Sequence, residues 1–321
     1  MKLATYLDRA DRSASRVGAV QHDRIHPIPE VASMRELVDL GLERALELGR
    51  NALDVPGIPL AHVTLQAPLQ PASVRDFVAF EAHVEGVRRS VDGVAGVPDA
   101  WYDAPTFYFT NPHTVVGPDE PVGFPAHSVA RDFELEVAVV IGRAGTSVSV
   151  EEAAQHVFGF TLMNDWSARD LQGAEMKVGL GPAKGKDFAT SLGPWIVTVD
   201  ELADRLDVDG FLDVEASVSV NGEVVGRDRV SHMGWGFWAL VAYASRDSRV
   251  VPGDVLGSGT TGGGGCLAEL WGRRGTQDPP PLRDDDVVEL HVEGLGALRN
   301  TVSSREPVPP LPTVRRHHDV T

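Results

Sequence analysis

The chain has 321 residues, of which 42% are hydrophobic and 23% charged, a composition typical of a globular protein able to bury a large core. Its net charge of −17 disfavours contact with nucleic acid or with an anionic membrane surface. A single cysteine, no apolar run near about 18 residues and no secretory leader lead us to expect a cytoplasmic protein without disulfides.

The first 67 residues are predicted to form a small α+β domain. Three short strands are expected at its start, over Lys2–Leu7, Arg16–Val20 and Arg24–Ile28. One amphipathic helix is expected over Ser33–Leu53, because Ser33 and Glu36 form a capping box and leucines recur at helical spacing. Clustered prolines then mark the exit of the domain near residue 67.

Residues 68–305 are predicted to form a mainly β catalytic domain. Strand-like runs recur along it at Thr106–Thr110, Phe133–Ile141, Gly159–Met163, Trp195–Val199, Val214–Val220, Val255–Leu256, Leu267–Leu270 and Val287–Val292. Turns are expected at Asn221-Gly222 and at 294–296, and helices over Ser73–Arg89, Glu151–Val157 and Met233–Ser245. Since strands and helices do not alternate, we expect an α+β fold and not a doubly wound parallel sheet. The proline-rich tail, residues 306–321, is expected to be a loose arm.

Two glutamates alternate with apolar residues in the run from Asp132 to Ile141. In a strand, Glu134 and Glu136 would share one face about 7 Å apart, while the residues between them would face the core. Such carboxylates repel each other unless water or a cation screens them, and oxygen ligands favour Mg²⁺, Mn²⁺ or Ca²⁺. By itself the pattern also fits the solvated face of an edge strand.

A further acidic residue, Asp165, ends an apolar run, so a rigid strand would position its carboxylate. Arg169 and Gln172 lie three residues apart and share a face if the segment after Asp165 is helical. A structural ion pair with a helix cap would explain the same residues.

Asp76 and His83 are seven residues apart. In one continuous helix they would lie about 10 Å apart on nearly the same face, where they could bracket a substrate, and a break in the helix would bring them closer. The alternative is that Asp76 completes a helix cap with Ser73 and that His83 is a surface histidine.

Two glycine-rich stretches need separate interpretations. The first contains Lys184, Gly185 and Lys186, but it lacks the glycine and hydroxyl positions of a phosphate-binding loop, so we expect its lysines to supply compact point charges. The second, Gly257–Gly262, has GxGxxG spacing, but we expect a strand after it and therefore no dinucleotide binding. A loop closing over a ligand fits better, with Glu269 just beyond it.

These segments together resemble the fumarylacetoacetate hydrolase family over roughly residues 70–305. The most specific stretch runs from Phe158 to Asp170 and contains the string NDWSARD, which is followed by Gly185-Lys186 and by Ser191–Trp195. The resemblance implies a mixed, rolled, barrel-like β fold with its site at the barrel mouth, and a homodimer.

The resemblance also implies roles for individual residues. The ligands of Mg²⁺, with Mn²⁺ or Ca²⁺ as alternatives, would be Asp76, Glu134, Glu136 and Asp165. The catalytic residues would be the base His83, its orienting partner Glu269, and the oxyanion-stabilising Lys186, Arg169 and Gln172. Substrate would also contact Arg169, Gln172 and Thr260, and Thr190 would lie near the metal.

The implied reaction is hydrolysis of a carbon–carbon bond in a β-diketo acid such as an acylpyruvate, a step of aromatic catabolism. Family members that cleave fumarylacetoacetate have tyrosines where this chain has Val78 and Met176, so its small keto acid substrate is expected to differ. The arginine found after the histidine has two candidates here, Arg88 and Arg89. A decarboxylase or isomerase of a keto dicarboxylate and an inactive metabolite-binding protein stay open as alternatives.

Overall fold

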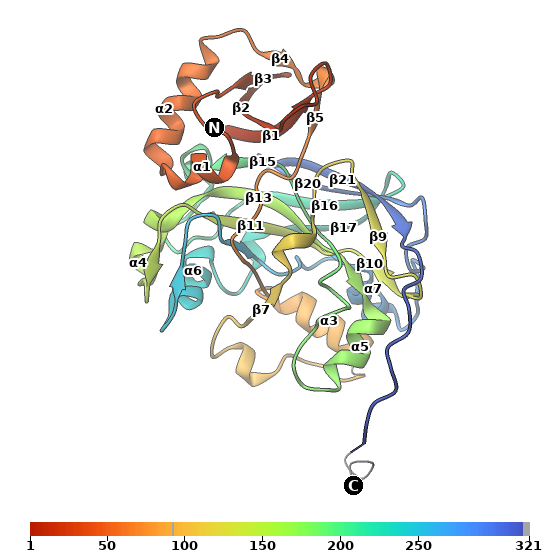
Figure 1. The fold of residues 1–321 in the computed structure, drawn as a ribbon. Helices are drawn as coiled ribbons and strands as arrows, with labels where there is room; N and C mark the ends of the chain where they lie inside the picture. The colour runs from red at the N-terminus through yellow and green to blue at the C-terminus, as the bar shows by residue number, and fades with distance from the viewer. Residues whose placement is uncertain (92, 317–321) are drawn as a thin grey trace.

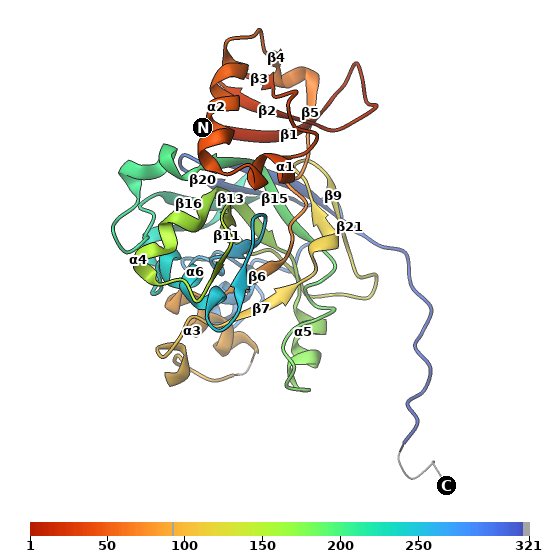
Figure 2. The same cartoon turned by 60° about the vertical axis from the view of Figure 1, so that its left-hand side comes forward.

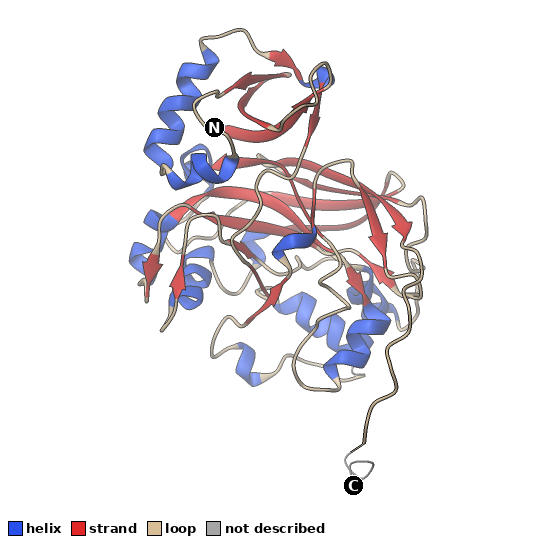
Figure 3. Cartoon of the chain, in the orientation of Figure 1, coloured by secondary structure: helices blue, strands red, loops and turns tan. Residues whose placement is uncertain are grey.

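Two β-sheets make up the centre of the molecule, and the helices lie around them (Figure 1, Figure 3). The computed structural model describes residues 1–91 and 93–316. The expectation of a mainly β, α+β fold is confirmed, and neither large sheet closes into a barrel within the described residues. None of the described helices has the length and apolarity needed to cross a bilayer.

The larger sheet has 12 strands in mixed orientation. Its main path runs in the order β4-β3-β2-β1-β15-β13-β11-β19-β6-β7, while β5 pairs with β1 and β8 pairs with β15. Its strands are β1 (Lys2–Asp8), β2 (Arg16–Gln21), β3 (Arg24–Pro27), β4 (Ile58–Pro59), β5 (Val63–Leu65), β6 (Val74–Phe77), β7 (Phe107–Thr110), β8 (Val115–Val116), β11 (Leu135–Ile141), β13 (Val157–Asp165), β15 (Thr190–Thr198) and β19 (Val255–Gly257).

The second sheet has five strands in the order β17-β16-β20-β21-β9. They are β9 (Pro121–Phe124), β16 (Glu215–Val220), β17 (Glu223–Arg229), β20 (Val287–Val292) and β21 (Gly296–Ser304). Two small ribbons pair β10 (Arg131–Asp132) with β14 (Ser167–Ala168) and β12 (Gly145–Thr146) with β18 (Arg249–Val250). The helices are α1 (Met34–Asp39), α2 (Leu42–Leu53), α3 (Glu81–Val91), α4 (Val150–Ala153), α5 (Arg169–Met176), α6 (Phe237–Ser245) and α7 (Leu267–Arg274).

The N-terminal strands extend the large sheet through the antiparallel pairing of β1 with β15. Both views place them with α1 and α2 at one end of the molecule (Figure 1, Figure 2). The single helix expected over Ser33–Leu53 is wrong, because the chain breaks at Gly41, whose φ of 84° lies in the left-handed region. The capping role of Ser33 is confirmed, since its side chain accepts a hydrogen bond from the Glu36 amide.

Strand β11 lies inside the sheet, between β13 and β19, and both of its faces are buried. Leu135 and Val137 belong to the main hydrophobic core, whereas Ala138 and Val140 pack into a second core shared with α1 and α2. The expected alternation of side chains along this run is therefore confirmed. The alternative of a solvated edge strand is wrong, since strands flank β11 on both sides.

Two further expectations of secondary structure are wrong. The helix expected over Ser73–Arg89 is divided into β6 and α3, because residues 74–77 pair with both β7 and β19. The strand expected over Leu267–Leu270 is the start of α7, so a helix does follow the glycine-rich loop. The Cys266 thiol and the remote carboxylate of Asp132 accept hydrogen bonds from the first amides of α7, caps that local sequence rules do not include.

The boundaries of other predicted helices differ from the observed ones by a few residues. The helix expected over Glu151–Val157 is α4 followed by a 3₁₀ turn, and the one expected over Met233–Ser245 begins only at Phe237. The Asn221-Gly222 hairpin is confirmed by the pairing of β16 with β17. In the expected loose arm, residues 305–316 form no helix or strand, and residues 317–321 lie outside the described residues.

Gly159→Ala tests how tightly the strands that carry the site are packed. A Cβ at Gly159 would overlap the carbonyl oxygen of Val197 on β15, which belongs to the backbone and cannot rotate away. We expect Gly159→Ala to lower the free energy of unfolding by roughly 2–3 kcal/mol in urea denaturation. Gly173→Ala is the control, because nothing lies within 4 Å of its Cβ position on α5 and helix propensity favours alanine. Equal stability of the two variants would contradict this packing.

Candidate metal and catalytic site

Four carboxylates converge at neighbouring strands of the large sheet. Asp76 lies on β6, Glu136 on β11 and Asp165 at the end of β13, while Glu134 directly precedes β11. All four residues are at least 96% buried. Strand β19 separates β6 from β11, and its Gly257 leaves room for the acids, since a Cβ there would come within 2.7 Å of Asp76 Oδ1 and 2.8 Å of Glu136 Oε2.

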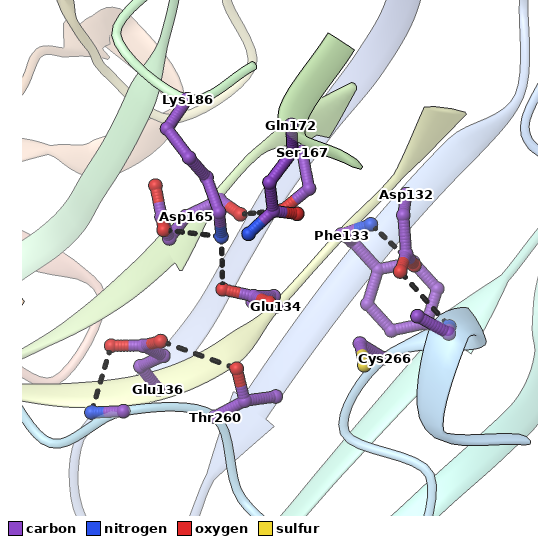
Figure 4. A network of polar contacts seen from close by, with 12 residues as sticks. Asp132, Phe133, Glu134, Glu136, Asp165, Ser167, Gln172, Lys186, Thr260 and Cys266 are labelled. Carbon is purple, nitrogen blue, oxygen red and sulfur yellow. Dashed lines mark hydrogen bonds and ion pairs between the residues drawn. The ribbon is translucent and has the colours of Figure 1, made fainter. Parts of the chain in front are cut away.

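Three of these acids form a tight group. One carboxylate oxygen from each of Asp76, Glu134 and Glu136 lies within 4.8 Å of the other two. Glu136 also accepts hydrogen bonds from the amide of Gly259 and the hydroxyl of Thr260, as Figure 4 shows. Asp76 Oδ1 is buried without a hydrogen-bond partner among the described residues.

Lys186 and Arg169 neutralise part of this charge, and Figure 4 shows the two contacts of Lys186. Lys186 Nζ lies 2.5 Å from Glu134 Oε2 and 2.6 Å from Asp165 Oδ2. Arg169 donates to Glu134 Oε1 at 2.7 Å and to Asp132 Oδ2 at 2.8 Å. Burial alone would raise the pKa of Glu134, but these two cations hold it well below its usual range. Glu134 therefore stays ionised, and Lys186 ties Asp165 to the three clustered acids.

Asp76 and Glu136 have no such partner, because no cationic side chain of the described residues forms an ion pair with either. Burial, and then the charge of Asp165, raises the pKa of Asp76 well above its usual range. Burial, and then the charge of Asp76, does the same for Glu136. A divalent cation would supply the positive charge that these two acids lack, and an all-oxygen donor set suits a hard ion such as Mg²⁺ or Mn²⁺. The residues present therefore fit the cation that the sequence predicts.

The candidate base lies where two helices cross. His83 on α3 is 6% exposed, and its Nδ1 lies 3.7 Å from Cys266 Sγ and 4.0 Å from Glu269 Oε2 on α7. The close crossing depends on two glycines, because a Cβ at Gly86 would overlap Glu269 and one at Gly272 would overlap the backbone of Gly86.

The environment sets the charge of each of these groups. Burial lowers the pKa of His83 to about 4, so the imidazole is neutral near pH 7. Burial also raises the pKa of Glu269 to about 7, although Arg273 forms an ion pair with it at 2.6 Å. The 4.0 Å separation of His83 Nδ1 and Glu269 Oε2 exceeds a hydrogen bond, so the two side chains are neighbours without a direct hydrogen bond.

Polar side chains complete the site. Arg169 and Gln172 share a face of α5 as predicted, and Arg169 Nη1 donates to Gln172 Oε1 at 3.0 Å. That bond leaves the amide nitrogen of Gln172 free, on the side where Lys186 Nζ lies in Figure 4. Thr190 pairs with Asp165 across β15 and β13, and its buried hydroxyl has no partner among the described residues.

Two site residues were missed from the sequence. Tyr108 donates a hydrogen bond to Asp165 Oδ2 and stands opposite Asp76 in the pairing of β6 with β7. Asp132 joins Arg169 to the first turn of α7, with its two oxygens accepting from the amides of Leu267 and Ala268. The sequence does show Asp132 next to the alternating glutamates and Tyr108 within a predicted strand. Neither could be assigned to the site, because the residues that they contact lie far away in the sequence.

Three of the four acids and the candidate base face one cavity of about 340 Å³, and Asp165 is not among its lining residues. Its lining includes Asp76, His83, Tyr108, Glu134, Glu136, Arg169, Gln172, Lys186 and Thr260. The alternative roles considered for Asp76 and His83 are wrong, because Ser73 bonds to Asp254 instead and His83 is buried. The amides that begin α7 are already bonded to Asp132 and Cys266, which leaves no free helix terminus there for a dinucleotide phosphate.

Comparison with known proteins agrees with this geometry. The model of the fumarylacetoacetate (FAA) hydrolase C-terminal family matches residues 72–303. The mitochondrial oxaloacetate tautomerase fahd2 of Xenopus laevis is 31% identical over 273 residues, which cover 84% of this chain and 78% of that protein.

Two solved structures share the fold. The fumarylacetoacetate hydrolase of Exiguobacterium antarcticum superposes with a TM-score of 0.74 at 27% identity, covering 95% of this chain and 100% of that one. The maleylpyruvate hydrolase of Sphingobium sp. SYK-6, solved with manganese(II) and pyruvate, has a TM-score of 0.70 at 23% identity and the same coverage. At this lower identity the likeness shows the fold.

Glu136→Gln tests the cation site without any assay of activity. Removing one of two facing acids relieves their repulsion, so we expect the metal-free variant to melt at or above the temperature of the wild type. Wild-type protein should gain about 2–3 kcal/mol of stability in Mg²⁺ or Mn²⁺ at a hundredfold excess over Kd, and Glu136→Gln should lose most of that gain. The exposed Glu223→Gln serves as control. An unchanged cation-dependent shift in Glu136→Gln would show that the ion binds elsewhere.

Proposed function

The chain belongs to the fumarylacetoacetate hydrolase family, and from that premise we propose that it is a divalent-cation-dependent hydrolase that cleaves a carbon–carbon bond in a β-diketo acid such as an acylpyruvate. The observation that carries the proposal is that a neutral, buried His83 faces the same cavity as the acids Asp76, Glu134 and Glu136. Members of this family include enzymes named as hydrolases and as tautomerases.

The cation would be held by Asp76, Glu134 and Glu136, with Asp165 beside them. When bound there, it would supply Lewis-acid polarisation of adjacent substrate oxygens and favour the enolate of the leaving fragment. The protein's own part is to position the acids: Lys186 bonds to both Glu134 and Asp165, and with Arg169 it keeps Glu134 ionised.

His83 would act as the general base. Its Nδ1 is directed toward Cys266 and Glu269, so Nε2 at the other edge of the ring is the atom left to take a proton from water. The buried carboxyl of Glu269 would stabilise the imidazolium that forms. Water thus adds to the acyl carbonyl as hydroxide, and its proton rests on His83.

Two donors would receive the negative charge that develops on that carbonyl oxygen, and the positive charge of the neighbouring Arg169 would add to their effect. Lys186 has one N–H left after its bonds to Glu134 and Asp165, and Gln172 has its free amide nitrogen. Arg169 is fixed on three sides by Asp132, Glu134 and Gln172, and it orients Gln172. The carbon–carbon bond then breaks, the acyl part leaves as a carboxylic acid, and the pyruvate enolate recovers a proton.

His83→Ala tests the assignment of the base. We expect kcat for an acylpyruvate to fall by about 10²–10⁴, because proton abstraction from water is lost. The Mn²⁺ affinity measured by calorimetry should stay within about twofold, since the clustered carboxylates are untouched. His62→Ala, an exposed histidine, is the matched control. Normal turnover by His83→Ala would rule out His83 as the base.

Cys266→Ser separates this mechanism from a thiol nucleophile. Burial raises the pKa of the Cys266 thiol well above its usual range, so it is neutral near pH 7. Its Sγ caps α7, a role that a serine hydroxyl also fills. We expect Cys266→Ser to retain turnover within about threefold, and a loss comparable to that of His83→Ala would instead favour covalent catalysis.

A second candidate is a tautomerase or decarboxylase that acts on a keto dicarboxylate. It is favoured by the 4.0 Å gap between His83 and Glu269, which does not form the hydrogen-bonded pair best suited to activating water, and by the relative named as an oxaloacetate tautomerase. Acylpyruvates and oxaloacetate should be assayed with Mg²⁺ and then with a chelator. Two carboxylic acid products from an acylpyruvate support the hydrolase, whereas carbon dioxide or keto–enol exchange without water addition contradicts it.

A further inference from the structure

A second chamber opens directly beside the acid-lined cavity. It has a volume of about 350 Å³ and shares Val78, Val87, Gln172 and Met176 with the inner cavity, as well as the base His83. A molecule whose reacting carbonyl lies near His83 would therefore extend its remaining part into this outer chamber. Because the two cavities share these lining residues, the group attached to the reacting carbonyl would bind in the outer chamber.

The outer chamber is mainly apolar, in contrast to the charged inner cavity. Its wall is built by Val84 and Val87 from α3, by Pro98 and Trp101 from the segment that follows α3, and by Val78 and Met176. The carboxylates that form the cation cluster do not line it. Such a wall favours a ring or an alkyl chain, since each buried methylene contributes about 0.8 kcal/mol.

Trp101 makes one side of this chamber rigid. Its indole nitrogen donates to the carbonyl of Val78 at 2.6 Å, and the residue as a whole is 8% exposed. Trp235 donates to the Trp101 carbonyl, and the Trp101 ring fills the space that a side chain at Gly234 would need. The indole face is thus held before a ligand arrives, so little conformational entropy is lost when an apolar group packs on it.

The chamber is less suited to a second carboxylate. Arg88 is the one cationic residue among its described lining residues, and its Nη1 already donates to the carbonyl of Gly96 at 2.6 Å. Val78 and Met176, which line both the chamber and the inner cavity, carry no group that could donate a hydrogen bond to a carboxylate.

We propose that the outer chamber is the acyl subsite and that it selects a β-diketo acid with an aromatic or alkyl acyl group over one that ends in a second carboxylate. This inference rests on the proposed function of the site. Val87 and Trp101 determine the selectivity, while the acid cluster holds the pyruvyl end that all such substrates share.

Three substrates test the selectivity: benzoylpyruvate, acetylpyruvate and fumarylpyruvate, each with Mg²⁺. We expect kcat/KM for benzoylpyruvate to exceed that for fumarylpyruvate by at least about tenfold, because the ring is buried against Trp101, whereas a second carboxylate would lose its water to a mainly apolar wall. Equal or better cleavage of fumarylpyruvate overturns the inference. If Arg88→Gln then abolishes that preference, the chamber is assigned to a carboxylate.

A variant pair localises the effect. Val87→Asn replaces a branched apolar side chain by a polar one of similar size, and we expect about tenfold lower kcat/KM for benzoylpyruvate with less than threefold change for acetylpyruvate. Val208→Asn, 90% exposed and not part of the chamber, should alter neither value. A parallel loss on both substrates in Val87→Asn would mean that the residue has a structural role only.

A binding measurement tests the apolar subsite independently of whether the protein hydrolyses an acylpyruvate. In the presence of Mg²⁺, phenylpyruvate should bind at least about tenfold more tightly than oxaloacetate when both are titrated by calorimetry. This preference is expected even if no acylpyruvate is hydrolysed, in which case the proposed hydrolase is wrong and the apolar subsite stands. Tighter binding of oxaloacetate would refute the subsite whichever reaction the protein catalyses.

Discussion

The structure depends on burying several carboxylates beside two buried cations. Lys186 joins Glu134 to Asp165, and Arg169 joins Glu134 to Asp132, so the two cations balance part of the negative charge. The facing acids Asp76 and Glu136 are left over. The pKa of each is raised well above its usual range, so both hold their protons more tightly than a free carboxyl group does. A divalent cation would displace these protons and balance both carboxylates, which would link the stability of the fold to its proposed chemistry.

The architecture places this charge at the sheet's interior rather than on a surface loop. Neighbouring strands deliver the acids, and glycines at the crossing of α3 and α7 let His83 approach Glu269. Asp132 connects Arg169 to the first turn of α7, so one carboxylate fixes both Arg169 and the helix that carries Glu269. Under the proposed function, the inner cavity would hold the reacting group and the adjoining apolar chamber would set the specificity.

Much of the site could be predicted because its residues follow local periodicity. Strand alternation placed Glu134 and Glu136 on one face, and helical spacing placed Arg169 beside Gln172. The resemblance of the NDWSARD string to a known family then suggested which scattered acids belong together. The mainly β character followed from the many short apolar runs and the hairpin at Asn221-Gly222.

The elements and site residues that the sequence did not predict depend on contacts between residues far apart in the chain. Residues 74–77 form a strand because β7 and β19 pair with them. Helix α7 begins after Cys266 because the remote Asp132 accepts hydrogen bonds from the first amides of the helix. The hydrogen bond from Tyr108 to Asp165 has the same origin. No local pattern encodes such partners, since pairing and capping across the chain override the propensity of a short apolar segment.

A crystal structure of the protein soaked in Mn²⁺, with the ion located by its anomalous scattering, would show whether the clustered acids bind a cation. We expect one strong peak within bonding distance of carboxylate oxygens from Asp76, Glu134 and Glu136, with Lys186 still bonded to Glu134. A saturating Mn²⁺ concentration that leaves this position empty, or an ion bound only at other residues, would contradict this expectation.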